Sequence, residues 1–143
     1  MSERLDESGI ESTTVSIMRT SATVKGGRRF SFAALVVVGD RQGSIGLGHQ
    51  KSGQVPQAIE KSQREAKRKL RKYPPTGSTS PHAVEGRFGA CKVLLITASP
   101  GTGVVAGAAV RAPLEMLGIR DCMTKCHGST NTLNFVKAVF NGL

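Results

Sequence analysis

The chain has 143 residues, a formal net charge of +10 and an isoelectric point near 10.2. Its apolar content of 38% supports a packed core and excludes wholesale disorder, and no apolar run approaches the ~18 residues of a membrane-spanning helix. The beginning of the chain is acidic and polar, unlike a signal or transit peptide, and three cysteines argue against a disulfide framework. We therefore expect a protein of a reducing compartment, without membrane contact, whose basic surface attracts polyanions, with nucleic acid as the leading candidate partner.

The first half of the chain predicts an acidic leader, three strands and one long helix. The leader, residues 1–14, holds four of the ten acids and is expected to be disordered. Gly46 and Gly48 lie two positions apart in the third predicted strand, which indicates close approach by another element. A recurrence of apolar and small residues every three or four positions is typical of one face of an amphipathic helix. The predicted domain, 15–73, has strands over 15–24, 30–38 and 44–49 and a helix over 54–73.

Two basic segments of this domain are candidate nucleic-acid contacts. A turn over residues 25–29 contains two glycines and three cations, and the predicted helix carries seven bases and one acid between Lys61 and Lys72. A charged helix face is usually solvated, with its cations paired to acids, but here the cations greatly outnumber the acids and repel one another. A partner that neutralises them is expected. Because Arg binds phosphate through two parallel hydrogen bonds, we interpret both segments as phosphate contacts.

A linker rich in Pro, Ser and Thr, residues 74–83, separates this domain from a second one over 84–143. Pro113 lies inside a predicted helix and is expected to kink or divide it. Thr130 or Asn131 is expected to cap the last helix. The chain is therefore predicted to have an α+β fold of two small domains. The predicted elements of the second domain are strands over 84–88, 91–98 and 119–125 and helices over 104–117 and 131–143.

The loop before the first helix of the second domain matches a dinucleotide-binding fingerprint. Gly101, Gly103 and Ala106 follow the pattern G-x-G-x-x-A after a buried strand, and Asp121 lies about 20 residues downstream, where that motif places an acid. The second domain is small, however, and the first supplies no second βαβ half. Three interpretations stay open: a nucleotide site, a tight strand-to-helix turn without a ligand, and exposed N–H groups that contact an RNA phosphate or a neighbouring protein.

Metal and catalytic hypotheses find little support in the sequence. Cys122, Cys126 and His127 are close together, but a structural zinc needs four ligands, typically in two close pairs. On a predicted strand both of these cysteines point to one face, which is typical of buried reduced thiols. His49 and His82 have no motif-level partner, and the scattered acids form no carboxylate pair. We expect no metal, no cofactor and no catalytic residue.

Four ordered motifs of the chain resemble a known family. They are TVKGGRRFSFAALVVVGDRQGSIGLGHQK, QVPQAIEKS, SPGTGVVAGAAVRAPLEMLGI and KCHGSTNTLNFVKAVFNGL. In order and spacing they are similar to small ribosomal subunit protein five of the bacterial type. The resemblance implies an N-terminal domain similar to double-stranded-RNA-binding domains. It also implies a C-terminal βαβα domain with a left-handed βαβ crossover, although most such crossovers are right-handed.

The resemblance implies a structural constituent of the small ribosomal subunit that binds its rRNA, supports assembly of the subunit body and influences decoding accuracy. The implied partners are small-subunit rRNA and ribosomal proteins four and eight, with messenger RNA nearby. The implied location is the ribosome of the bacterial cytoplasm, with an organelle ribosome as the alternative. Loop 24–29 matches the family's RNA-contacting, spectinomycin-linked loop, and region 103–111 matches its accuracy-linked contact with protein four. The candidate protein-interface residues are Gly101, Gly103, Gly107 and Arg111. The candidate rRNA-binding residues are Arg19, Lys25, Gly26, Gly27, Arg28, Arg29, Lys51, Lys61, Arg64, Arg68, Arg71, Ser129 and Asn131.

Two other hypotheses remain beside the ribosomal one. A free double-stranded-RNA binder with a regulatory role would bind generic duplex RNA as well as ribosomal RNA. A nucleotide-binding enzyme that uses the loop at Gly101 would be stabilised against heat by its nucleotide.

Overall fold

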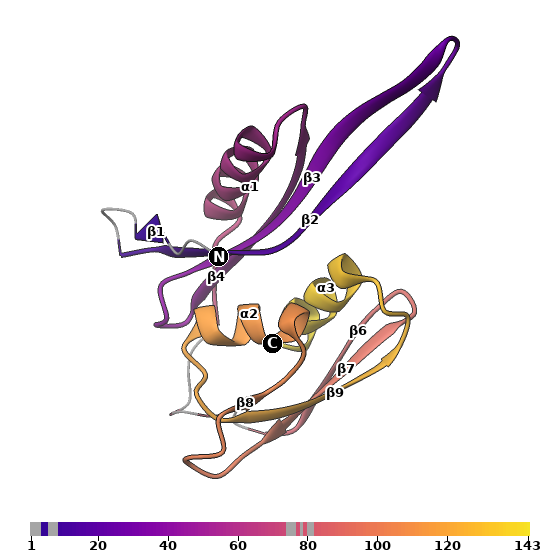
Figure 1. The fold of residues 1–143 in the computed structure, drawn as a ribbon. Helices are drawn as coiled ribbons and strands as arrows, with labels where there is room; N and C mark the ends of the chain where they lie inside the picture. The colour runs from indigo at the N-terminus through magenta and orange to yellow at the C-terminus, as the bar shows by residue number, and fades with distance from the viewer. Residues whose placement is uncertain (1–3, 6–8, 74–76, 78, 80–81) are drawn as a thin grey trace. The chain divides into compact units, whose positions relative to one another are not determined.

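The computed structural model has an α+β fold with two sheets and three helices among its described residues (Figure 1). The chain divides into two compact units. The first comprises Met1–Val38 and Gly46–Leu70, and the second comprises Gly39–Ile45 and Arg71–Leu143. The structure describes residues 4–5, 9–73, 77, 79 and 82–143, so that 1–3 and 6–8 of the predicted leader and 74–76, 78 and 80–81 of the predicted linker lie outside the described residues.

A five-stranded sheet contains the N-terminal strands in the order β1-β2-β3-β4-β5. β1 pairs antiparallel with β2, and β4 pairs antiparallel with β5. The long strands β2, β3 and β4 are followed by α1, which is the predicted βββα succession. The bounds are β1 Arg4–Leu5, β2 Glu11–Val24, β3 Gly27–Gly39, β4 Ser44–Ser52, α1 Val55–Arg68 and β5 Arg71–Lys72.

The strand β2 begins before the predicted end of the acidic leader. Residues 11–14, assigned by composition to a disordered leader, are part of this strand. Ile10 packs against the core, and the buried hydroxyl of Ser12 accepts a hydrogen bond from Gln63 Nε2 of α1 at 3.0 Å. Polar composition did not reveal this because the stabilising contact comes from a helix 51 residues away.

The core of the first unit lies between β3 and α1. Ala34, Val36 and Val38 alternate along one face of β3 and pack against Ala58 and Ala66 of the helix. At Gly48 a methyl group would collide with the carbonyl oxygen of Ser62, and at Gly46 with that of Ala66. The two glycines therefore let α1 lie directly on β4, which confirms the close approach that their spacing predicts.

The helix α1 ends earlier than its periodicity predicts. It stops at Arg68, and the amide of Lys69 donates to the carbonyl oxygens of Glu65 and Ala66. Arg71 and Lys72 instead form β5, which pairs with Ile45 and Ser44 of β4. The predicted end at residue 73 was wrong because the backbone of Arg71 and Lys72 pairs with the edge of β4 instead of continuing the helix.

The second unit contains a four-stranded sheet in the order β6-β7-β9-β8, with α3 packed on β6 and β7 and α2 packed on α3. β6, β7 and β9 are antiparallel neighbours, whereas β8 pairs parallel with β9. Because α2 connects β8 to β9, these three elements form a βαβ unit (Figure 1). The bounds are β6 Val84–Phe88, β7 Cys91–Thr97, β8 Val104–Val105, α2 Ala108–Leu117, β9 Cys122–Gly128 and α3 Thr132–Gly142.

Two predicted boundaries of this unit are corrected. The helix predicted from residue 104 begins at Ala108, because Val104 and Val105 pair with Cys122 and Met123 of β9. The strand predicted over 119–125 lies at Cys122–Gly128. Periodicity alone cannot distinguish a helix from a strand in a short apolar segment such as 104–106, and here the parallel pairing with β9 decides the conformation.

Pro113 lies inside α2 and is buried, yet α2 is one continuous helix from Ala108 to Leu117. The predicted division of this helix is therefore not observed. Gly118, with φ of +99°, ends the helix in the left-handed conformation that favours glycine. No helix among the described residues is long and apolar enough to cross a membrane.

Candidate nucleic-acid interface

The turn between β2 and β3 carries the most concentrated positive charge of the first unit. Lys25 and Gly26 connect the two strands, and Gly26 has φ of +96°, a conformation that favours glycine. Every residue from 21 to 30 is exposed. We name residues 17–31, the outer part of this hairpin, the arm (Figure 1). Its cations, Arg19, Lys25, Arg28 and Arg29, are all exposed, as the sequence predicts for the turn.

The arm has no acid of its own. No Asp or Glu occurs between Glu11 and Asp40, so nothing along this stretch of chain offsets the four cations. The arm also exposes apolar side chains, with exposed fractions of 44% for Ile17, 48% for Met18 and 51% for Phe30. A two-stranded hairpin is only marginally stable in water unless another element packs against it. A ligand that covers the arm would bury these apolar side chains and stabilise the hairpin.

A cation–π contact organises one face of the arm. The Arg19 guanidinium carbon lies 4.0 Å from the centre of the Phe30 ring. Phe30 alternates with Ala34 and Val36 along β3, so it belongs to the face that α1 covers farther along the strand. The arm therefore extends that face beyond α1 with an exposed aromatic ring, which offers a surface for a nucleobase. Phe30 was not among the candidate residues that the sequence predicts.

The cations of α1 are partly paired within the helix. Arg64 Nη2 lies 2.6 Å from Glu60 Oε1, and Lys69 Nζ lies 2.5 Å from Glu65 Oε1. Both partners of the Arg64–Glu60 pair are exposed, so this pair contributes little to stability and a polyanion displaces Glu60 at small cost. Lys61 and Arg68 are exposed on the same helix. The helix therefore remains a basic surface, although nearby acids neutralise more of its positive charge than the composition indicates.

Glu65 connects α1 to β4 and has a structural role. Its Oε2 accepts hydrogen bonds from the backbone amide of His49 at 2.9 Å and from Gln50 Nε2 at 3.0 Å. Partial burial by itself raises the pKa of Glu65, but the hydrogen bonds from Lys69, His49 and Gln50 outweigh it and hold the pKa below the ordinary value. Glu65 therefore joins α1 to β4 by hydrogen bonds, and its negative charge is already paired with Lys69 within the unit.

The remaining candidate RNA contacts lie in different places. Lys51 is exposed near the end of β4, and Arg71 is exposed on β5, which belongs to the second unit. Asn131 caps α3, because its Oδ1 accepts from the amide of Asn134 at 3.2 Å, which confirms the predicted cap. The hydroxyl of Ser129 accepts from the Asn131 amide at 3.3 Å. Both residues thus have local structural roles at the start of α3.

The glycine loop binds an anion that the chain itself supplies. Oδ1 of the buried Asp121 accepts hydrogen bonds from the amides of Gly101 and Gly103 at 3.1 and 3.0 Å. In a dinucleotide site such amides would face a pyrophosphate, and the downstream acid would bind a ribose. Here that acid occupies the place of the phosphate. The two amides are therefore not available to a nucleotide phosphate, and the loop leads from β7 into the short strand β8 rather than directly into a helix.

The other predicted interface residues lie just beyond this turn. Gly107 is the N-cap of α2. Arg111 donates from Nη2 to the carbonyl oxygen of Val104 at 3.0 Å, and its Nε lies 3.9 Å from Glu115. Arg111 and Glu115 line a hollow of about 510 Å³ together with Arg41 and Arg120. The sequence did not predict the last two arginines, because they are far apart along the chain and meet only in the folded unit.

Two of the three thiols, those of Cys91 and Cys122, are buried, and that of Cys126 is partly buried. Cys91, Cys122 and Cys126 are free. Burial raises the pKa of Cys122, and burial together with the nearby Cys91 raises the pKa of Cys126. A raised pKa keeps a thiol protonated at neutral pH, and a protonated thiol is a poor nucleophile. No group of three metal-ligating side chains occurs among the residues that the structure describes.

Comparison with known proteins assigns the chain to a family. The family model described as "Ribosomal protein S5, N-terminal domain" matches residues 10–74, and that described as "Ribosomal protein S5, C-terminal domain" matches residues 86–143.

Several relatives carry the name small ribosomal subunit protein uS5. The one from Caulobacter vibrioides is 51% identical over 142 residues, which cover 99% of this chain and 70% of the relative. The one from Psychrobacter cryohalolentis is 49% identical over 135 residues, which cover 94% of this chain and 79% of the relative. The one from Syntrophobacter fumaroxidans is 53% identical over 129 residues, which cover 90% of this chain and 78% of the relative. The chain belongs to the ribosomal protein S5 family, and the N- and C-terminal domain models of that family both match it.

Proposed function

We propose that this protein is a structural constituent of the small ribosomal subunit that binds small-subunit rRNA through the arm and the basic side of α1. The observation that carries the proposal is the arm, with four exposed cations, no acid between Glu11 and Asp40, and an exposed aromatic ring. Such a surface neutralises phosphates and offers a place for a base to stack. Membership of a ribosomal protein family identifies the class of polyanion.

The protein acts by positioning and is not an enzyme. Its family is a family of ribosomal proteins, and the glycine loop that suggested a nucleotide holds Asp121 instead. Contacts to phosphates fix orientation without reading sequence, so specificity for rRNA comes from the shape of the folded RNA. Support for assembly of the subunit body and for decoding accuracy near the messenger-RNA entry follows from such positioning.

Finer features that the sequence resemblance implies are part of this proposal. The βββα succession of the first unit supports a domain similar to double-stranded-RNA-binding domains. The parallel β8–α2–β9 unit supports the βαβ crossover, for which we propose the left hand. The family models end at residue 74 and resume at residue 86, which supports a domain boundary at the predicted linker.

Partners and location belong to the proposal as well. Region 101–111, with the turn held by Asp121 and the hollow beside Arg111, is the proposed contact with ribosomal protein four, and ribosomal protein eight is the second proposed protein partner. The proposed location is the ribosome in the bacterial cytoplasm, in keeping with the bacterial relatives.

Competition between RNAs tests the proposal against the free double-stranded-RNA binder. Labelled small-subunit rRNA is bound to the full chain and displaced either by unlabelled rRNA or by a random-sequence duplex of equal nucleotide content. A ribosomal protein releases its rRNA to the rRNA competitor at far lower concentration than to the duplex. Equal displacement by both competitors would favour the free RNA binder, because a shape-general binder does not distinguish them.

A further inference from the structure

One face of the second sheet is left open by the helices of its unit. Along β7 the side chains of Cys91, Val93 and Leu95 are buried beneath the helices, with exposed fractions of 0 to 1%. The alternating residues Lys92 and Ile96 point the other way and are 37% and 38% exposed. The strands β6 and β9 follow the same alternation, so the three strands share an uncovered face.

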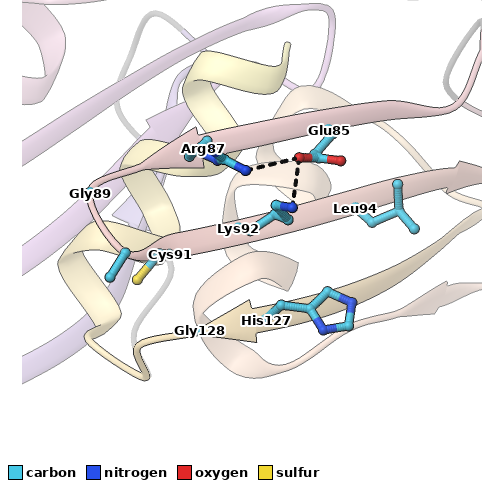
Figure 2. A pocket seen from close by; sticks show the side chains of 9 residues that line it. Glu85, Arg87, Gly89, Cys91, Lys92, Leu94, His127 and Gly128 are labelled. Carbon is cyan, nitrogen blue, oxygen red and sulfur yellow. Dashed lines mark ion pairs between the residues drawn. The ribbon is translucent and has the colours of Figure 1, made fainter.

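Basic side chains form a row straight across this face. The register pairs Arg87 with Lys92, and Lys92 with His127, so three basic residues of three neighbouring strands lie directly opposite one another. Figure 2 shows their side chains on the same side of the sheet. In the next row Leu94 pairs with Lys125, which adds a further cation on the same face. We name Arg87, Lys92, Lys125 and His127 the basic row.

This arrangement has an electrostatic cost when the chain is alone. Like charges directly opposite each other destabilise a sheet. Glu85 relieves part of the repulsion, since its Oε1 lies 3.3 Å from Lys92 Nζ and 3.8 Å from Arg87 Nη2 (Figure 2). One exposed carboxylate shared between two cations contributes little in water, and Lys125 is an additional positive charge. A ligand with several negative charges would remove the repulsion.

The shape of the face admits such a ligand. A hollow of about 580 Å³ lies over the row and is lined by Glu85, Arg87, Lys92 and His127. At one end the lining consists of Gly89, Ala90 and Gly128, and a methyl group at Gly128 would collide with the carbonyl oxygen of Ala90. The exposed apolar residues Ile96, Met123 and Val105 lie outside this hollow.

We infer that the basic row binds the phosphate backbone of RNA, as a contact of the second unit separate from the arm. The inference rests on the proposed function, because it takes rRNA as the polyanion. A protein partner fits the hollow less well, since the centre of a protein–protein interface is depleted of Lys and Glu and is built around apolar or aromatic anchors. Here the centre of the hollow is charged and Leu94 is its one large apolar side chain.

The salt dependence of RNA binding tests the inference. Affinity of the full chain for a small-subunit rRNA transcript is measured over a series of salt concentrations for the wild type and for Arg87→Gln combined with Lys125→Gln. The slope of log affinity against log salt should fall by about 0.7 to 0.9 for each phosphate that the variant no longer neutralises. At 0.1 M salt this corresponds to an affinity loss of about five- to eightfold per phosphate relative to 1 M salt.

The matched control is Lys137→Gln. Lys137 belongs to α3, on the covered side of the same sheet, where its ammonium lies 4.9 Å from the centre of the Phe88 ring. This substitution removes one positive charge from the same unit and should leave the slope unchanged. An unchanged slope in the Arg87→Gln, Lys125→Gln variant would overturn the inference. Binding of poly-glutamate, as a model of an acidic protein, is measured for the same proteins. If the Arg87→Gln, Lys125→Gln variant alone loses poly-glutamate binding, the face belongs to an acidic protein and the inference is wrong.

A second measurement needs no variant. Lysine acetylation by a soluble acylating reagent is compared in the free chain and in its rRNA complex, with the modified positions read by mass spectrometry. Lys92 and Lys125 should be protected in the complex and Lys137 should react equally in both. If the arm lysine Lys25 is protected but Lys92 and Lys125 are not, the inference is wrong while the proposed function stands. If the wild-type protein does not bind the transcript at all, the inference and the proposed function are both wrong.

Discussion

Asp121 Oδ1 accepts a hydrogen bond from the amide of Gly103 at 3.0 Å, and the same oxygen accepts one from Gly101 at 3.1 Å. This relationship explains why the loop imitates a nucleotide-binding motif. The glycines provide backbone amides, as they would for a phosphate, but the anion is a carboxylate 18 residues away from Gly103. The buried Asp121 thereby fixes the connection between β7 and α2 on which the proposed interface with protein four depends.

Replacing Asp121 should destabilise the fold. Asp121→Ala leaves the two amides without this acceptor, and we expect the free energy of unfolding to fall by about 2 to 3 kcal/mol. Asp121→Asn retains an oxygen of similar position and should reduce it by only about 1 kcal/mol. Urea denaturation followed by circular dichroism measures both. Equal losses in the two variants would show that the hydrogen bonds to Gly101 and Gly103 are not what Asp121 contributes.

Removing cations from the arm should weaken RNA binding in a salt-dependent way. Arg28→Ala combined with Arg29→Ala should reduce the slope of log affinity against log salt by about 0.7 to 0.9 for each phosphate that the arm no longer neutralises. The measurement is a titration of labelled small-subunit rRNA at several salt concentrations. Lys137→Ala is the control, and a slope equal to that of the wild type in the double variant would mean that the arm does not neutralise phosphates.

The aromatic ring of the arm should contribute a part of RNA affinity that does not depend on salt. Phe30→Leu keeps an apolar side chain but removes the face on which a base stacks, and we expect binding to weaken by about 1 to 3 kcal/mol with an unchanged salt slope. Phe88→Leu is the matched control, since Phe88 is also exposed and also has a cation over its ring. Equal effects of the two substitutions would contradict a specific role for Phe30.

The close approach of α1 to β4 predicts intolerance to one methyl group. Gly48→Ala should reduce the free energy of unfolding by about 1 to 3 kcal/mol, because the added carbon collides with the carbonyl oxygen of Ser62. Gly53→Ala is the control, since no atom lies within 4 Å of a methyl group there. Chemical denaturation of both variants decides the matter, and equal stability would refute the tight packing of α1 on β4.

Acid should release the contribution of Glu65. Its pKa is lower in the folded chain than in the unfolded one, so its stabilisation is present above the unfolded pKa and is lost as pH falls through the folded pKa. The stability difference between wild type and Glu65→Gln should therefore shrink between about pH 5 and about pH 3. Unfolding curves across this range measure it. A difference that stays constant would mean that the hydrogen bonds from Lys69, His49 and Gln50 do not favour the charged form.

Local patterns predicted those elements whose conformation depends on their own residues. The strand at Val84–Phe88, the Asn131 cap and the helix contact at Gly46 and Gly48 all have signals within a few positions of themselves. The strand residues 11–14 and β5 do not, because each is stabilised by a distant segment: Ser12 by Gln63, and Arg71 by Ile45. Their pairing is visible only in the folded chain.

In the candidate site, too, local signals predicted some residues, whereas others depend on contacts between distant segments. The cations of the arm follow from composition and from the glycine turn. Phe30 and the basic row were missed because they depend on strand alternation and register, which place residues from separate strands on one face. A signal for the row was present in the sequence, since Lys125 and His127 alternate along one strand as Glu85 and Arg87 do along another. Only the register shows that Arg87, Lys92 and His127 lie side by side.

The most direct test of the central claim is sedimentation of the tagged full chain from a cell lysate on sucrose gradients at low and then high salt. We expect the protein to migrate with the small ribosomal subunit and to remain there at high salt, because shape fit and protein contacts add to counterion release. Migration at the top of the gradient at both salt concentrations would contradict a role as a constituent of that subunit.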